Sequence, residues 1–351
     1  MDVYRLPHGN VMSLPSGRRI DFRMRRSVSS LKIPRVRIRR LGILFGVLTI
    51  VPIAICGAAS IRSTQLSGYK AVPVHYGPLN KMIMSVNIDG QPANLLVDTG
   101  ANQIILDATA AESLGVRPSQ HRLTYIGLTE INGQLLPMAF VRSLTAGSMS
   151  FGSSLVALLP SGARSNLSSR WGDSRSRVNG VLGADILVRH KAVINCRTQF
   201  IFLKTDQSRP SQITAFALSE KFTKIPLRRE ENGAFTVPCS IHRQAGRLVV
   251  DTGGFVTTFN EATVKSLGIS LQSTRASARF TSGVGRPISI GQFNDLMIGD
   301  FKVPAAKFGV AMLPNFVLAQ GNTRSVGILG MDLLYKARAI IDFDSMSLFL
   351  K

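Results

Sequence analysis

The chain has few of the residues that build disulfide scaffolds, metal centres or phosphate sites. Its 3 cysteines, Cys56, Cys196 and Cys239, have no partner at a zinc-binding spacing, and its 5 histidines are scattered. The sequence has neither an HExxH segment nor a phosphate-binding glycine loop. We therefore expect no metal ion and no cofactor, and the sequence gives no support for a metalloenzyme or a nucleotide-binding enzyme.

Acidic residues are also scarce. Only 20 Asp and Glu stand against 42 Lys and Arg, which gives a formal net charge of +22. A basic protein can bind nucleic acid or another polyanion, and steep salt dependence of binding would reveal this. Basic runs interleaved with aromatic residues are missing after the first 41 residues. A basic surface facing an anionic envelope is the simpler interpretation, and no nucleic acid is expected as a partner.

The start of the chain predicts a membrane anchor. Residues 1–40 are basic and have no lasting apolar period, which indicates a flexible tail. Residues 41–61 carry no charge and are long enough to cross a bilayer as a helix. A buried core helix and a cleavable signal peptide are the alternatives. Small residues at 57–59 fit a cleavage site, whereas the long preceding tail favours an uncleaved anchor.

The position of the basic cluster predicts the orientation of this anchor. Because the cluster precedes the apolar run, we expect a single-pass protein with its N-terminus in the cytoplasm and the rest outside, in the periplasm if the source is a Gram-negative bacterium. Membrane lipids would then be partners of the anchor and the basic tail.

A repeated pattern fills most of the remaining chain. Residues 95–106 read LLVDTGANQIIL and residues 248–259 read LVVDTGGFVTTF. Each is an apolar run that ends in Asp-Thr-Gly, which is typical of a buried strand leading into a tight loop where Gly permits unusual backbone angles. Shifting the chain by 153 residues superposes these segments, and the ends of the two units match with a shift of 147. The chain is therefore predicted to be an internal duplication.

This duplication predicts the organisation of the chain. The expected segments are a basic tail at 1–40, a transmembrane helix at 41–61, a juxtamembrane linker at 62–71, a first lobe at 72–204, a linker at 205–220 and a second lobe at 221–351. In each unit one short helix should follow the Asp-Thr-Gly loop. Asp107 and Asn260 are suitable residues to begin it, and Gly115 and Gly268 are suitable to end it.

Asp98 and Asp251 are the candidate catalytic residues, since they occupy equivalent loops of the two units. Two facing carboxyl groups cannot easily both ionise, so they would share a proton and hold one water molecule between them. One carboxylate would act as general base, and the other, protonated, would polarise the scissile carbonyl group. The pattern therefore predicts hydrolysis without a covalent intermediate.

A second signature follows each loop in the same order. It reads Val181-Leu182-Gly183 in the first unit and Ile328-Leu329-Gly330 in the second, continuing as GADIL and GMDLL. With these motifs the chain resembles the retropepsin-like aspartic proteases, in a tandem single-chain form. The resemblance implies an all-β fold of two lobes related by a pseudo-twofold axis, in which the second segment passes beneath the Asp loop.

The resemblance also implies roles for the residues beside each aspartate. The hydroxyl groups of Thr99 and Thr252 would bond across the lobe interface, and Gly100 and Gly253 would let the backbone approach the carboxylates. For the threonines, a purely structural role as β-branched residues at a strand end is the alternative.

A glycine-tipped flap over the substrate is a further implication of the resemblance. It makes Gly133 the flap candidate in the first unit, and Gly283 and Gly285 the candidates in the second. Turn chemistry alone fits an ordinary surface hairpin at both places equally well.

The expected function is that of a membrane-anchored aspartic endopeptidase acting on extracytoplasmic protein or peptide substrates, with a monomeric catalytic region. The alternative is a pseudoprotease that binds extended peptides without cutting them. Gly254 favours this alternative, because the family prefers Ala, Ser or Thr at that place. Export would also permit a disulfide between Cys196 and Cys239.

Overall fold

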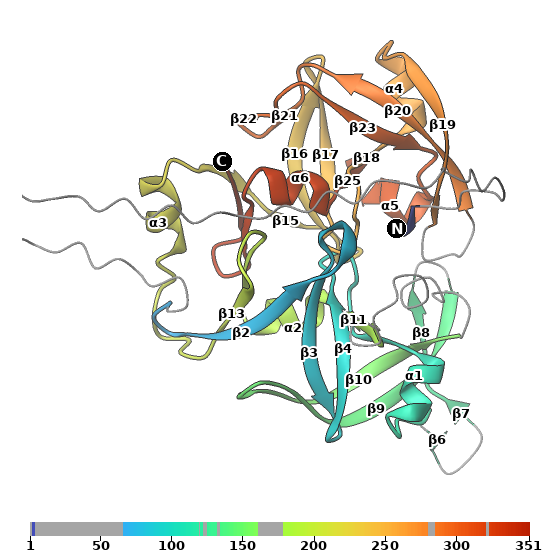
Figure 1. The fold of residues 1–351 in the computed structure, drawn as a ribbon, viewed down its shortest axis with the longest axis vertical. Helices are drawn as coiled ribbons and strands as arrows, with labels where there is room; N and C mark the ends of the chain where they lie inside the picture. Colours follow the sequence, from blue (N-terminus) through green and yellow to red (C-terminus); the bar gives the residue numbers. More distant parts are fainter. Residues whose placement is uncertain are drawn as a thin grey trace, which may run out of the picture. The chain divides into compact units, whose positions relative to one another are not determined.

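Strands predominate in the computed structural model of the chain, and the helices are few and short (Figure 1). The structure describes residues 2–3, 66–118, 120–121, 125–131, 134–160, 178–279, 285–320 and 323–351. The predicted transmembrane segment at 41–61 lies outside these residues. Among the helices that the structure describes, none is long and apolar enough to cross a membrane.

The first lobe extends from β2 to β13, and both of these strands also take part in the sheet that the two lobes share. Its elements are β2 (Tyr69–Tyr76), η1 (Pro78–Asn80), β3 (Met82–Ile88), β4 (Gln91–Val97), β5 (Ile105–Asp107), α1 (Ala108–Ser113), β6 (Gln120–His121), β7 (Tyr125–Ile126), β8 (Leu128–Ile131), β9 (Gln134–Ala146), β10 (Met149–Leu159), β11 (Gly180–Leu182), α2 (Ala184–Arg189), β12 (Val193–Asn195) and β13 (Phe200–Lys204).

The second lobe follows the helix α3 (Ile213–Ser219). Its elements are β14 (Thr223–Pro226), β15 (Arg228–Arg229), β16 (Phe235–Ile241), β17 (Gln244–Val250), β18 (Thr258–Asn260), α4 (Glu261–Ser266), β19 (Leu271–Arg279), β20 (Gly285–Phe293), β21 (Met297–Ile298), β22 (Phe301–Lys302), β23 (Ala306–Ala311), α5 (Asn315–Leu318), β24 (Ala319–Gln320), β25 (Thr323–Leu329), α6 (Met331–Lys336), β26 (Ile340–Asp342) and β27 (Ser347–Leu350).

The two lobes share one unusual strand arrangement. In the first, β11 runs parallel to β4 and antiparallel to β5. In the second, β25 runs parallel to β17 and antiparallel to β18. Each Asp-Thr-Gly loop therefore leaves a strand whose neighbour is the strand of the hydrophobic-hydrophobic-Gly signature. The two motifs that are separated in sequence lie side by side, and they do so twice.

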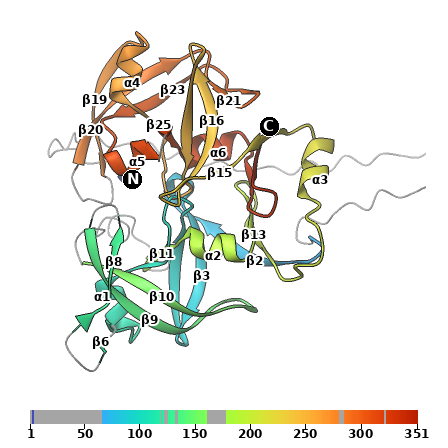
Figure 2. The ribbon, with the colours of Figure 1, turned by 180° about the vertical axis from the view of Figure 1, so that it is seen from behind.

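A sheet built from both lobes joins them, in the order β14, β27, β26, β12, β13 and β2. Its strands β2 and β13 lie at one side of the lobes in Figures 1 and 2. Its centre is the antiparallel pair of β12 and β26, in which Ile194 lies opposite Ile341 and Val193 lies opposite Asp342. Ile194 and Ile341 are also equivalent by the shift of 147 residues. A pseudo-twofold axis therefore passes between them, as in a symmetric dimer interface.

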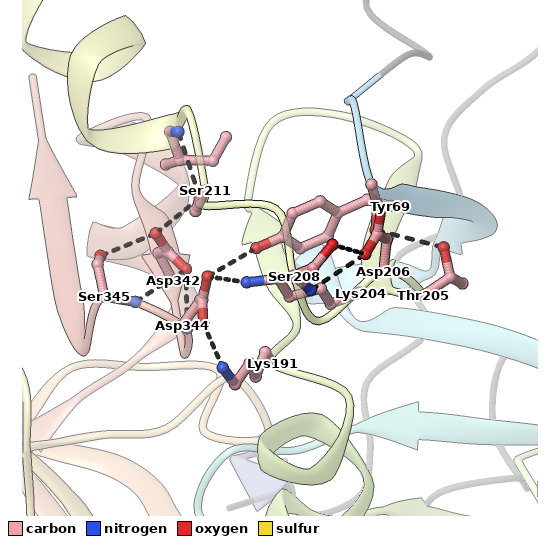
Figure 3. Close-up of polar contacts among 12 residues, drawn as sticks. Tyr69, Lys191, Lys204, Thr205, Asp206, Ser208, Ser211, Asp342, Asp344 and Ser345 are labelled. Atoms are coloured by element: carbon pink, nitrogen blue, oxygen red, sulfur yellow. Dashed lines mark hydrogen bonds and ion pairs between the residues drawn. The ribbon is translucent and has the colours of Figure 1, made fainter.

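Charged side chains from both lobes form ion pairs at this sheet (Figure 3). The ammonium group of Lys204 on β13, whose side chain is 3% exposed, is ion-paired with Asp344 in the turn between β26 and β27. Lys191 Nζ lies 2.9 Å from the other oxygen of the same carboxylate. The hydroxyl group of Tyr69 donates to Asp344 Oδ2 at 3.4 Å. Burial acts to raise the pKa of Asp344, but the bonds and charges of Lys204 and Lys191 hold this pKa below its ordinary value.

The short helices predicted after the Asp loops are present as α1 and α4. Asp107 caps α1 by accepting a hydrogen bond from Ala110 N at 3.1 Å. Gly115 and Gly268 follow them with φ of +73° and +70°, where a side chain would be strained. In α4 the N-cap residue Asn260 makes no side-chain cap bond.

The predicted linker at 205–220 contains the helix α3. The polar residues at the start of the linker do not indicate this helix. Ile213 and Ala217 of α3 are buried, and hydrophobic contacts rather than local propensity therefore hold this helix.

The disulfide permitted between Cys196 and Cys239 is absent, because both are buried, free thiols. Burial raises the pKa of each thiol to about 12, which keeps both protonated and unreactive.

Two residues of the predicted basic tail are described, and they form a strand. β1 (Asp2–Val3) pairs antiparallel with β19, and the rest of the predicted basic tail lies outside the described residues. A two-residue pairing is too short to be stable alone. A chain anchored with its N-terminus in the cytoplasm would lose the pairing of β1 with β19, because the bilayer would separate the two strands.

Candidate active site

The Asp-Thr-Gly loops leave β4 and β17 at equivalent places, and each is held by the neighbouring strand. Asp98 N donates to Leu182 O at 3.1 Å, and Asp251 N donates to Leu329 O at 3.1 Å. Because both strands are buried runs of aliphatic residues, the start of each loop is fixed by the core.

Glycine is required where the second signature passes beneath each loop. A β-carbon on Gly183 would collide with the backbone of Gln103, and one on Gly330 would lie 2.8 Å from Gly254 O. The next residue of each signature donates to the loop: Ala184 N to Ala101 O and Met331 N to Gly254 O, both at 2.7 Å. The close approach predicted for this segment is therefore present in both lobes.

The two loops are joined by a reciprocal set of hydrogen bonds. Thr99 N donates to Thr252 Oγ1 at 3.0 Å, and Thr252 N donates to Thr99 Oγ1 at 3.0 Å. Each hydroxyl group then donates to the strand of the opposite lobe, Thr99 to Val250 O at 2.7 Å and Thr252 to Val97 O at 2.9 Å. Both threonines are buried. The N–H and hydroxyl groups of both threonines thus form hydrogen bonds across the lobe interface. Their role is therefore larger than that of β-branched residues at the end of a strand.

This interface brings the two predicted catalytic carboxyl groups together. A β-carbon added to Gly100 would lie 2.8 Å from Asp251 Cγ, and one added to Gly253 would collide with the carboxylate of Asp98. Each loop glycine therefore faces the carboxylate of the other lobe, and no larger residue fits there.

Backbone N–H groups orient the two carboxylates within their own loops. Asp98 Oδ1 accepts from Gly100 N at 2.8 Å and from Ala101 N at 3.1 Å. Asp251 Oδ1 accepts from Gly254 N at 2.8 Å. Such bonds fix which oxygen faces the opposite lobe and favour the charged form of each group.

One carboxyl group of the pair holds its proton unusually well. Burial raises the pKa of Asp251 to about 7, and the charge of Asp98 together with a hydrogen bond between the two carboxyl groups acts in the same direction. Two carboxyl groups in this position titrate as a pair that shares one proton. Near neutral pH the site can therefore offer one acidic and one basic oxygen to a water molecule.

Sequence reasoning missed the role of the acidic residue in the second signature. Asp332 Oδ1 accepts from Thr257 N at 2.7 Å and from Thr257 Oγ1 at 2.6 Å, which fixes the segment after the second Asp loop. In the first lobe the equivalent pair is Asp185 and Ile104, and one oxygen of Asp185 is buried without a hydrogen-bond partner. Burial raises the pKa of Asp185. The aspartate that GADIL and GMDLL have in common is the feature of the sequence that could have indicated this role.

Two further contacts cross between the lobes beside the loops, and the sequence did not indicate them. Asn102 Nδ2 donates to Asn232 O at 2.7 Å, and Lys81 Nζ lies 4.8 Å from the centre of the Phe255 ring. Asn102 and Phe255 are equivalent by the shift of 153 residues. The same position therefore makes a hydrogen bond in one lobe and a cation–π contact in the other.

The flap candidates fall on hairpins whose tips are only partly described. Gly285 begins β20 and pairs with Arg279 on β19. Gly133 and Gly283 lie outside the described residues, between β8 and β9 and between β19 and β20. The hairpins predicted in the middle of each unit are present, and a role as flaps stays a prediction.

Comparison with known proteins gives a matching family model and similar solved structures. A family model described as "Aspartyl protease" matches residues 84–186 and 237–333, and each matched segment contains one Asp loop and one second signature. No curated protein matches the chain. Among solved structures, the chain is similar to an aspartic proteinase from Irpex lacteus, with 12% identity, a TM-score of 0.45, and coverage of 80% of this chain and 96% of that one. The chain belongs to the aspartyl protease family.

Proposed function

We propose that this protein is a retropepsin-like endopeptidase in tandem single-chain form, which cleaves peptide bonds with a water molecule held between Asp98 and Asp251. The observation that carries the proposal is the reciprocal threonine bonding, which brings one carboxyl group from each lobe to a common point. Bonds of this kind leave the carboxylates little freedom, and preorganised groups need little rearrangement during the reaction.

The chemistry follows from the shared proton. The ionised carboxylate takes a proton from water as the oxygen attacks the carbonyl carbon, and the protonated carboxyl group donates a hydrogen bond to the carbonyl oxygen. Collapse of the tetrahedral intermediate returns a proton to the leaving amine. Since burial and the facing carboxyl group of Asp98 raise the pKa of Asp251 to about 7, turnover should fall as the pH rises past this value and the pair loses its shared proton.

The test is to replace each carboxyl group by an amide in the full chain. Asp98→Asn and Asp251→Asn should each lower kcat/KM by about 10²–10⁴-fold or more, because each removes the base or the shared proton. The double variant should lose little more, since the two groups act as one unit. Cleavage of a peptide library should be measured for all four proteins, with Asp300→Asn as the matched control, because Asp300 is an exposed surface carboxylate.

Two outcomes would contradict this proposal. If Asp251→Asn cleaves at the parental rate, the second loop is structural and the two carboxyl groups do not act as one unit. If the parent protein binds peptides and cleaves none of them, the chain is a peptide-binding module, the alternative that Gly254 favours in the sequence.

We further propose that residues 41–61 anchor the protein in a membrane, with residues 1–40 in the cytoplasm and the two lobes outside. The support is the uncharged length of this segment and the basic cluster before it. Alkaline phosphatase fused after Lys351 should be active, because this reporter works only outside the cytoplasm. A fused fluorescent protein that folds only in the cytoplasm should be dark, and the reverse pattern would refute the orientation.

A further inference from the structure

The helix α3 carries no charged residue, although it lies on the surface. Its sequence is ITAFALS over Ile213–Ser219, and Ile213 and Ala217 form its buried face. On the flanks of this face, Phe216 is 39% exposed and Leu218 is 53% exposed. A surface helix of a globular domain ordinarily has charged or polar residues opposite its core face. The flanks of α3 instead present large apolar side chains to the surroundings.

The position of α3 connects it to the proposed anchor. Leu66 packs in the same hydrophobic cluster as Ile213 and Ala217, on the sheet shared by the two lobes. The apolar segment 41–61 ends five residues before Leu66, and five residues span at most about 17 Å. The chain must therefore leave the bilayer close to α3.

Basic residues adjoin this helix at its C-terminal end. Lys221 and Lys224 are exposed, and Lys351 Nζ pairs with Glu220 at a distance of 3.6 Å. Apolar side chains beside lysines are the combination that binds at the boundary of a bilayer, where long basic side chains reach the lipid phosphate groups.

We propose that Phe216, Leu218, Lys221 and Lys224 form a membrane-contact surface, which rests on the bilayer that holds the anchor. This inference depends on the anchoring proposed above and adds the orientation of the lobes. In Figures 1 and 2, α3 lies on the side of the lobes opposite the β19–β20 hairpin. Contact through α3 therefore directs this hairpin away from the lipid, so that protein substrates approach from the aqueous side.

Tryptophan fluorescence in vesicles tests the surface without reference to activity. The chain has one tryptophan, Trp171, so Trp171→Phe gives a silent background. Phe216→Trp places a probe on the surface, and Met312→Trp is the matched control, because Met312 is 58% exposed and lies between β23 and α5 in the second lobe. Each full chain is reconstituted in phosphatidylcholine and phosphatidylglycerol vesicles with plain or brominated acyl chains, and thermal melting confirms folding.

The expected result is at least a two-fold loss of emission from the Phe216→Trp chain in brominated vesicles, with unchanged emission from the Met312→Trp chain. Equal emission of the Phe216→Trp chain in both kinds of vesicle would overturn the proposal. A blue-shifted but unquenched probe would also overturn it and would indicate a protein partner or a second copy at α3. Carbonate extraction separates the two proposals: a chain released into the supernatant has no anchor, whereas a chain retained in the pellet with an unquenched probe is anchored without contact at α3.

Discussion

At the scale of single residues, Gly254 decides where the carboxylate of Asp251 lies. Gly254 N donates to Asp251 Oδ1 at 2.8 Å, and a β-carbon on Gly254 would lie 2.9 Å from Asp251 Oδ2. The equivalent residue of the first loop, Ala101, has its methyl group and packs it against a hydrophobic cluster. The two loops thus differ in the space beside the carboxylate, although the N–H group at this position donates to the carboxylate in both.

We predict that Gly254→Ala lowers kcat roughly 10-fold, since a carboxylate displaced by a fraction of an ångström no longer aligns with its partner. KM should change less than kcat, because the added β-carbon would face the carboxylate of Asp251 rather than the parts of the substrate that only bind. Steady-state kinetics measure both values. The control is Ala101→Gly, which leaves the bonds to Asp98 in place and should cost less. A rise in kcat for Gly254→Ala would mean that the missing methyl group limits the enzyme.

At the scale of elements, the turn between β26 and β27 holds the lobes together through a buried charge. Asp344 is the ion-pair partner of Lys204, whose side chain is 3% exposed. Removal of one member of a buried pair leaves the other charged and desolvated, which costs about 3–5 kcal/mol. We predict a loss of this size in the free energy of unfolding for Asp344→Asn, measured by denaturant titration.

The matched control is Glu261→Gln, because Glu261 pairs with Lys265 at 2.7 Å on α4, away from Lys204, and such exposed pairs contribute about 0–1 kcal/mol. The pH dependence provides a second check. The pKa of Asp344 is lowered in the folded state, so its contribution is present above the ordinary carboxyl pKa of about 4 and is lost as the pH falls below it. The difference in stability between the parent and Asp344→Asn should therefore shrink at acid pH. A difference that stayed constant down to about pH 2 would contradict this origin.

At the scale of the whole molecule, one chain supplies both halves of the site. The β12–β26 pair and the threonine bonds lie within a single chain, and both Asp loops are present. We predict that the specific activity is independent of protein concentration, and that sedimentation of the detergent-solubilised protein gives one chain per particle. Activity that rises with the square of the concentration would show that two chains build the site.

The sequence by itself determined the two Asp-Thr-Gly loops, the repeated pattern that contains them and the short helices after each loop. It could do so because each depends on local chemistry: an aliphatic run makes a buried strand, Asp107 caps a helix, and Gly115 tolerates a positive φ. It also paired Asp98 with Asp251, since a repeat at constant spacing implies equivalent positions in equivalent folds.

Only the tertiary structure decided what depends on contacts between distant segments. The α3 helix is held by a hydrophobic cluster with residues from both lobes. The sequence does not show these contacts, and the polar residues before α3 therefore predicted a linker. Cys196 and Cys239 are buried free thiols, a fact that no spacing in the sequence reveals. The Lys204–Asp344 pair joins residues 140 positions apart. Packing and burial are long-range properties, and they fix charge pairs and strand neighbours that local sequence leaves open.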